Sequence, residues 1–288
     1  MKKFELTTEF ITNALGKKLF RIKALVEFGS VKAGELGGYA EKEENISQDG
    51  NAWVSGDARV YGNAWVSGDA RVYGDAWVHG NAKVFGNAEV YGDTEVSGDA
   101  LVYGNAKVSD NVRVSDNAKV FGNAEVYGDA KVSDNAKVFG NAEVYGDAKV
   151  FGNAWVSDDA CVYGDAKVFG NAWVSGDAKV SDNAKVFGNA EVYGDTKVSG
   201  DAKVSDNVEV SGDADYALVK GFGAEFRCTT FYRDKNKKIM VNCGCFHGDL
   251  EAFRKQVKET RSGKIAKEYL MIADLMEYHF TSEGSNNE

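Results

Sequence analysis

Two consecutive blocks of eighteen residues, NAKVFGNAEVYGDAKVSD (117–134) and NAKVFGNAEVYGDAKVFG (135–152), are nearly identical. They belong to a longer pattern in which a valine recurs at every sixth position from Val54 to Val210, giving 27 hexads without an insertion. The consensus hexad is Ala-x-Val-x-Gly-Asp/Asn. A fixed internal period of this kind indicates a repeat architecture, in which each unit buries its apolar side chains against its neighbours.

Each hexad predicts a short strand followed by a bend. The alanine and the valine are two positions apart, so they lie on the same side of an extended segment, and the residues flanking the valine face the other way. Gly-Asp, Gly-Asn and Asp-Asn pairs tolerate the positive φ that a tight corner requires. The chain contains no proline, which would interrupt strand pairing. We therefore expect the chain to coil around stacked valines and alanines.

The small-then-aliphatic spacing of residues 51–214 resembles the bacterial hexapeptide-repeat family. This resemblance implies a mainly-β fold, a left-handed parallel β-helix with three hexads per coil and about nine eighteen-residue coils. The Gly-Gly-aromatic/acidic stretch before the repeats is similar to the segment that leads into the repeats of uncharacterised phage and bacterial proteins of this family. The region after the repeats resembles a C-terminal module of prophage-encoded proteins.

Four regions follow from these patterns. We expect a β-rich N-terminal cap at 1–50, the β-helix at 51–214, a small α+β module at 215–280 and a disordered tail at 281–288. Within the module, the sequence predicts a β-hairpin that turns at Asp234–Lys237 and then two amphipathic helices. Asp249 is the expected N-cap of the first helix.

Charge and composition limit the location and the partners of the chain. Of a net charge of −10, residues 51–214 carry 14 Lys/Arg and 25 Asp/Glu, which argues against direct binding to nucleic-acid phosphates. Glu5 and Glu9 interrupt any apolar signal-peptide core, and no stretch approaches the length of a membrane span. Four cysteines do not make a disulfide framework at this length. We expect a cytoplasmic protein of a bacterial host, without a cofactor.

Two weak candidates for chemistry are present. Acyltransferases of the hexapeptide family use a histidine beside a loop that projects from a coil, and His79 is the one histidine of the repeats, although no hexad is interrupted by a loop. In the C-terminal module, Cys243, Cys245 and His247 are expected to share a strand face, with Cys228 on the facing strand, as a conceivable zinc site. The alternatives are an exposed structural histidine and ordinary apolar thiols.

The outward positions suggest binding surfaces. Residues eighteen apart fall into one column, and all five tryptophans (53, 65, 77, 155 and 173) are expected to point outward. One column ends in a row of lysines beside stacked phenylalanines, and corner aspartates such as Asp147 are expected to neutralise that row. The candidates for partner binding are Trp77, Lys131, Lys149, Lys167, Lys185, Phe151, Phe169, Phe187, Tyr127, Tyr145, Tyr163, Trp155 and Trp173.

Three functions are compatible with these features. The favoured one is a non-catalytic, phage- or prophage-associated scaffold that presents aromatic and charged columns to a protein partner, including a host factor. The alternatives are a hexapeptide-class acyltransferase and an acidic mimic of nucleic acid that inhibits a DNA-binding protein. Association into a dimer or trimer is a further expectation, because contiguous exposed aromatic area usually marks an interface.

Overall fold

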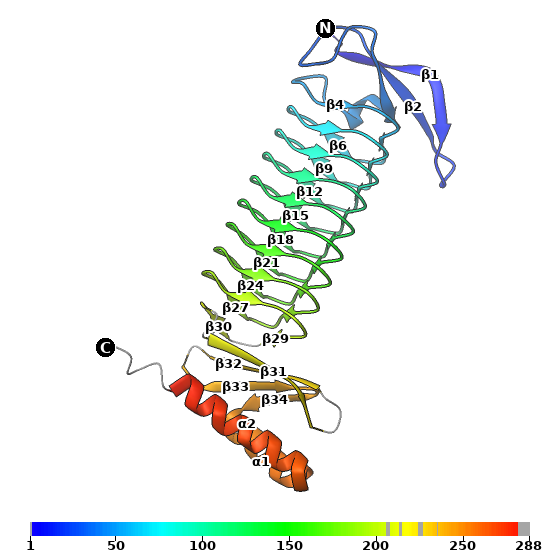
Figure 1. Ribbon diagram of the computed structural model, residues 1–288. Helices are drawn as coiled ribbons and strands as arrows, with labels where there is room; N and C mark the ends of the chain where they lie inside the picture. Colours follow the sequence, from blue (N-terminus) through cyan, green and yellow to red (C-terminus); the bar gives the residue numbers. More distant parts are fainter. Residues whose placement is uncertain (1, 206–207, 213–214, 224–226, 235, 282–288) are drawn as a thin grey trace.

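The computed structural model describes residues 2–205, 208–212, 215–223, 227–234 and 236–281. The chain forms a rod in which a β-rich cap, a long coil of short strands and an α+β module follow one another (Figure 1). The cap consists of β1 (Phe4–Thr12), β2 (Lys18–Ala24) and β3 (Leu36–Ala40), followed by a 3-10 turn at Glu43–Asn45. Because β3 pairs in parallel with β5 (Arg59–Val60), the cap sheet continues directly into one face of the coil.

The repeats form a parallel β-solenoid, as the hexad period predicts. Every strand from β4 (Trp53–Val54) to β30 (Glu209–Val210) consists of a repeat valine and the residue before it. These strands are hydrogen-bonded into three sheets, in which each valine pairs with the valine eighteen residues later, as Val126 pairs with Val144. We call them the lysine face (β5, β8 and every third strand to β29), the tyrosine face (β4, β7 and every third strand to β28) and the tryptophan face (β6, β9 and every third strand to β30).

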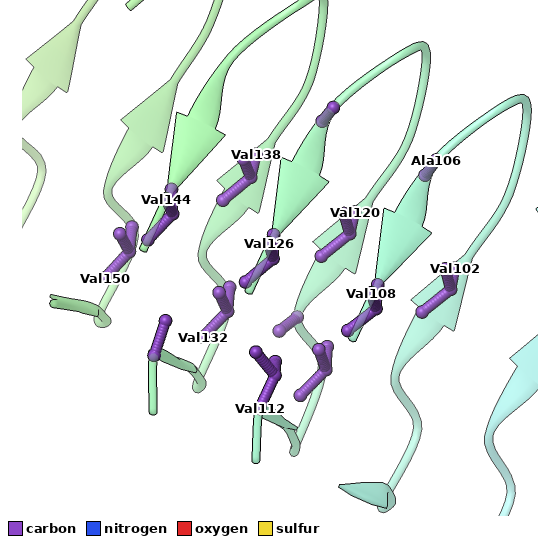
Figure 2. Packing of buried hydrophobic residues seen from close by; sticks show 14 of the residues in the cluster. Val102, Ala106, Val108, Val112, Val120, Val126, Val132, Val138, Val144 and Val150 are labelled. Carbon is purple, nitrogen blue, oxygen red and sulfur yellow. The ribbon is translucent and has the colours of Figure 1, made fainter. Parts of the chain in front are cut away.

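The core is a stack of identical small side chains. The repeat valines and alanines are fully or almost fully buried along the whole solenoid, and Figure 2 shows valines of successive coils in register. Thr94 and Thr196 stand at alanine positions and are also buried. Each threonine hydroxyl donates a hydrogen bond within its own corner, to the carbonyl oxygens of Tyr91 (2.6 Å) and Tyr193 (2.8 Å), so the polar group is satisfied.

Two side-chain ladders reinforce the corners. Asn87, Asn105, Asn123 and Asn141 form a chain of amide hydrogen bonds, each to the next at 2.9–3.0 Å, that ends on Asp159. At several corners an aspartate with φ of 58–63° replaces glycine. The carboxylate of such an aspartate accepts the backbone amide of the next coil, and the N–O distance from Gly152 to Asp134 Oδ2 is 2.9 Å. Both devices tie one coil to the next.

The C-terminal module contains the expected hairpin and two further strands. The hairpin of β32 (Arg227–Arg233) and β33 (Ile239–Cys243) lies inside a four-stranded antiparallel sheet, between β31 (Tyr216–Phe222) and β34 (Phe246–Asp249). Helices α1 (Leu250–Thr260) and α2 (Gly263–Thr281) follow, and Asp249 caps α1 by accepting the Ala252 amide at 2.7 Å. The expected tail, 281–288, lies outside the described residues except for Thr281, which ends α2.

The module closes the end of the solenoid. Tyr232 from β32 is fully buried against the valine core. Asn242 donates a hydrogen bond to the Lys203 carbonyl oxygen at 2.9 Å, and the Thr230 hydroxyl accepts the Lys203 amide at 3.1 Å. The opposite side of the sheet packs on α1 and α2 through Phe231 and Val241. No helix among the described residues is long and apolar enough to cross a membrane.

Candidate binding faces of the solenoid

The tryptophan face carries a continuous row of aromatic rings. Phe85, Tyr103, Phe121 and Phe139 stack with centroid separations of 4.8–4.9 Å and interplanar angles of 1–4°. Trp155 then meets Phe139 edge-on at 6.2 Å and Trp173 at 6.0 Å. We call these six residues the aromatic strip. Parallel strands one coil apart place equivalent side chains within stacking distance, which sets the order of the first four rings. Trp155 extends the row from the neighbouring column, in which it is paired with Lys137.

The two tryptophans of the strip are held in place yet remain accessible. Trp155 is 39% exposed and Trp173 is 40% exposed. The Lys137 ammonium lies 4.3 Å from the centroid of the Trp155 ring, and the Trp173 indole nitrogen donates to the Ser157 hydroxyl at 3.0 Å. Rings fixed in this way lose little conformational freedom on binding a partner. The strip is therefore a preorganised apolar surface.

The tyrosine face combines stacked phenols with carboxylates. Tyr127, Tyr145 and Tyr163 stack at 4.8 and 5.0 Å, and the Tyr127 hydroxyl donates to Glu143 at 3.2 Å. Partial burial, and then the neighbouring Glu143 carboxylate, raise the pKa of Tyr127 well above its usual value. Burial raises the pKa of Tyr145 as well. Tyr127 and Tyr145 therefore stay neutral hydrogen-bonding groups at physiological pH.

The lysine face carries the predicted rows, but they do not form a bare basic strip. Phe151, Phe169 and Phe187 stack at 4.9 and 5.0 Å. Beside them runs a groove of about 510 Å³, in which lysines from one column and carboxylates from the corner column alternate. The groove is lined by Asp147, Lys149, Asp165, Lys167, Asn183, Lys185, Asp201 and Lys203. Lys131 lines a neighbouring hollow of about 440 Å³ together with Arg113, Asp129, Asp147 and Lys149. The local charge is close to balanced.

His79 is a rung of an aromatic stack. Its ring lies parallel to Tyr61 at a centroid distance of 4.9 Å and an angle of 8°, and its Nε2 is 3.0 Å from Glu95 Oε1. Trp77, on the same strand face, is 39% exposed and lies 5.1 Å from the Arg59 guanidinium. The histidine has a carboxylate partner, but the uninterrupted hexads leave no projecting loop beside it.

One tryptophan expected to point outward is covered. Trp53 is only 5% exposed, because the cap folds over the first coil and places Phe4 and Phe28 edge-on against its indole at 6.5 and 5.4 Å. The hexad pattern orients Trp53 away from the valine core, but it contains no information on what the cap residues will cover.

The cysteines and the histidine of the C-terminal module do not meet as expected. Gly244 and Cys245 form a turn between β33 and β34, so Cys243 pairs with Phe246, and His247 pairs with Asn242 on the other face of the sheet. His247 Nδ1 is 2.7 Å from Asn242 Oδ1, whereas Cys243 Sγ accepts the Thr229 hydroxyl at 3.1 Å. Alternation along β32 likewise sets Cys228 on the face opposite Thr229. No cluster of three or more metal-ligating side chains occurs among the residues that the structure describes. The prediction of one shared strand face was wrong because the run 243–247 bends back on itself.

Sequence reasoning missed a pocket at the junction of the cap and the first coils. This cavity of about 500 Å³ forms where the loop at 29–35 approaches the tyrosine face. Its polar and aromatic lining includes Glu35, Asn51, Trp53, Asp69, Arg71, Tyr73 and Glu89. Most of these residues lie in eighteen-residue columns of the tyrosine face, but the repeat pattern does not indicate that the loop at 29–35 will approach them.

A comparison with family models agrees with the repeat architecture of the first coils. A family model described as the YdcK beta solenoid repeat matches residues 52–68 and 64–80. No curated protein matches the chain. Among solved structures, LpxA from Acinetobacter baumannii is similar at 11% sequence identity, covering 51% of this chain and 71% of that chain with a TM-score of 0.29. The hexad register and the three stacked sheets define this chain as a parallel β-solenoid protein.

Proposed function

We propose that this protein is a non-catalytic binding rod, which engages a protein partner through the aromatic strip of the tryptophan face. The observation that carries the proposal is the continuity of the strip, with six rings in contact from Phe85 to Trp173. Binding energy at protein interfaces is concentrated in a few well-ordered aromatic anchors, with tryptophan and tyrosine prominent among them. A contiguous exposed aromatic surface of this kind typically marks an interaction site.

The side chains beside the aromatic strip indicate which surface chemistry the partner needs. The column next to the phenylalanines carries Lys83, Leu101, Lys119 and Lys137, so basic groups flank the rings on this half of the face. A matching partner presents an apolar ridge bordered by carboxylates, because opposite charges at the rim steer association and set the register. We propose that this chain is encoded by a phage or prophage and that its partner is a cytoplasmic protein of the host.

The structural setting of His79 supports a non-catalytic function. Its ring is stacked on Tyr61 and its Nε2 is bonded to Glu95, within an uninterrupted stack of coils. Burial, and then the Glu95 carboxylate, raise the pKa of Tyr61, which keeps its phenol neutral beside the His79 ring. In our proposal His79 contributes to the packing of this face.

Site-specific photocrosslinking and matched tryptophan variants test the proposal. A photoreactive phenylalanine analogue at Phe121 should capture the partner in host cells, whereas the same analogue at Phe169 on the lysine face should not. With the captured protein in hand, the double variant Trp155→Ala/Trp173→Ala should weaken binding by roughly 30-fold or more, as expected for two hot-spot anchors. Trp77→Ala is the matched control, because Trp77 is equally exposed but lies on the lysine face.

Other outcomes would point to the alternatives. Equal affinity of the double variant and the control would reject the strip as the binding surface. Turnover of an acyl-CoA that His79→Ala abolishes would support the acyltransferase. Capture of DNA-binding proteins, released by moderate salt and unaffected by the tryptophan variants, would support the acidic mimic.

A further inference from the structure

Helix α2 carries apolar side chains on two sides, and the C-terminal core of the described residues covers one of them. The inner side packs into the C-terminal core through Tyr269, Ile272, Ala273, Met276 and Phe280. On the opposite side Met271 is 60% exposed, Leu275 57% and Tyr278 71%. Spacings of four and three residues place these side chains on one stripe of the helix. Helix α2 lies at the end of the rod remote from the cap (Figure 1).

Charges are distributed unevenly along the same stripe. At 100° per residue, Lys264, Lys267 and Glu268 fall on its N-terminal part and Asp274 on its C-terminal part, with Lys264 Nζ 3.5 Å from Glu268 Oε1. The Lys264 side chain is 88% exposed and that of Asp274 is 71% exposed. Arg254 of α1 bonds to Asp274 at 2.8 Å and to Glu277 at 2.7 Å, which orders the acidic end. The stripe thus has a net positive charge at one end, an apolar middle and a net negative charge at the other end.

Such a stripe is complementary to itself when reversed. Lys264 and Tyr278 each lie seven residues from Met271, and Lys267 and Asp274 lie four and three residues from it on opposite sides. A twofold axis at Met271 therefore places each Lys264 ammonium beside the Tyr278 ring of the other copy. It also places each Lys267 beside Asp274 of the other copy. A parallel arrangement would instead set like charges against each other.

We propose that α2 is a homodimerisation surface, on which two copies of this chain pair antiparallel around a twofold axis at Met271. The contact is isologous, so it closes on itself and stops at the dimer. It joins the two rods by their C-terminal modules and leaves the three faces of both solenoids accessible. The surface is separate from the aromatic strip and does not depend on the function proposed for it.

Disulfide crosslinking tests the position of the axis. In a Cys245→Ser background, which removes the exposed native thiol, Met271→Cys should form a disulfide-linked dimer on mild oxidation. Tyr278→Cys in the same background should not, because antiparallel copies of that residue are fourteen positions apart, about 21 Å along the helices at 1.5 Å per residue. Efficient crosslinking through Tyr278→Cys instead would indicate parallel pairing and overturn the proposed arrangement.

Charge reversal tests the pairing without crosslinking. The full chain should sediment with twice its mass of 31.2 kDa at high concentration. Lys267→Glu and Asp274→Lys should each raise the dimer dissociation constant about tenfold, and the double reversal should restore most of the loss. Circular dichroism confirms that each variant is folded. A chain that is monomeric at all concentrations overturns the proposal, as does a dimer that responds to Trp155→Ala/Trp173→Ala and not to the α2 variants.

Discussion

The Lys3 ammonium donates a hydrogen bond to the carbonyl oxygen of Ala52 at 3.0 Å, and a second to that of Gly50 at 3.2 Å. Lys3 is 4% exposed and its ammonium lies 4.8 Å from the Phe28 ring. The side chain thus occupies the open end of the first coil, where backbone carbonyls would otherwise lack partners. A β-solenoid needs such a closure at both ends, because its terminal strands have no further coil to pair with.

The buried position of Lys3 predicts a rise in stability at alkaline pH. Burial lowers the pKa of Lys3 to about 8, against the ordinary value near 10.5 that applies in the unfolded chain. Between these values the unfolded state binds more protons than the folded state, so the free energy of unfolding should increase with pH, by roughly 1 kcal/mol per pH unit. Urea denaturation from pH 8 to 9.5 measures the slope, which should be lower in Lys3→Met than in the native chain by about this amount. An identical slope in the variant would show that another group titrates.

Aspartate at a corner is expected to stabilise the folded chain more than alanine at the same position. Asp134 has φ of 58°, which disfavours alanine, and its carboxylate accepts the Gly152 amide. We expect Asp134→Ala to lower the free energy of unfolding by about 1–2 kcal/mol, because both the left-handed conformation and the hydrogen bond are affected. Asp134→Gly should cost less, since only the hydrogen bond is lost. Thermal unfolding compares the two, and equal losses would contradict the conformational part of the argument.

Glycine at a stacked corner should be hard to replace. Gly104 has φ of +77°, and a Cβ there would lie 2.9 Å from the Gly122 backbone nitrogen of the next coil. Gly16 has nearly the same φ, +76°, with no atom within 4 Å of the added Cβ. Gly104→Ala should therefore destabilise the protein by about 1–3 kcal/mol more than Gly16→Ala, the cost of the overpacked contact. Similar unfolding temperatures for the two variants would mean that the coils separate readily.

His79 should be replaceable by another ring. His79→Phe retains the stack on Tyr61, so its unfolding midpoint is expected to remain near that of the native chain. His79→Ala removes the stack and should cost about 0.5–1 kcal/mol, the usual size of a cross-strand pair. If the phenylalanine variant were the less stable of the two, the contact with Glu95 and not the stack would be the main contribution of His79.

The thiols should differ sharply in reactivity. Burial, and to a smaller extent the Glu143 carboxylate, raises the pKa of the Cys161 thiol, whereas Cys245 is exposed at a turn. Iodoacetamide at pH 8 should therefore modify Cys245 well before Cys161, as read by peptide mass spectrometry. Glu143→Gln should speed alkylation of Cys161 by roughly two- to threefold, because the nearby negative charge is removed. Glu125→Gln, one coil further away in the same column, is the control and should leave the rate unchanged.

The sequence by itself determined the solenoid and the composition of its faces. A valine at every sixth position predicts a coil that buries all the valines, and the resemblance to the hexapeptide-repeat family adds three hexads per coil, which is an eighteen-residue register. The columns of lysine, tyrosine and tryptophan follow from that register alone. Turn residues and hydrophobic periodicity predicted the hairpin after Asp215 and the N-cap at Asp249, because these signals act over a few neighbouring positions.

Only the tertiary structure decided which of these outward residues remain accessible. The cap covers Trp53, and the turn at Gly244 sends Cys243 and His247 to opposite faces of a sheet. The exposed stripe of α2 was also decided there, because the sequence shows a broadly apolar helix without indicating which side the sheet will cover. Burial depends on contacts between segments distant in sequence, and no local pattern records those contacts.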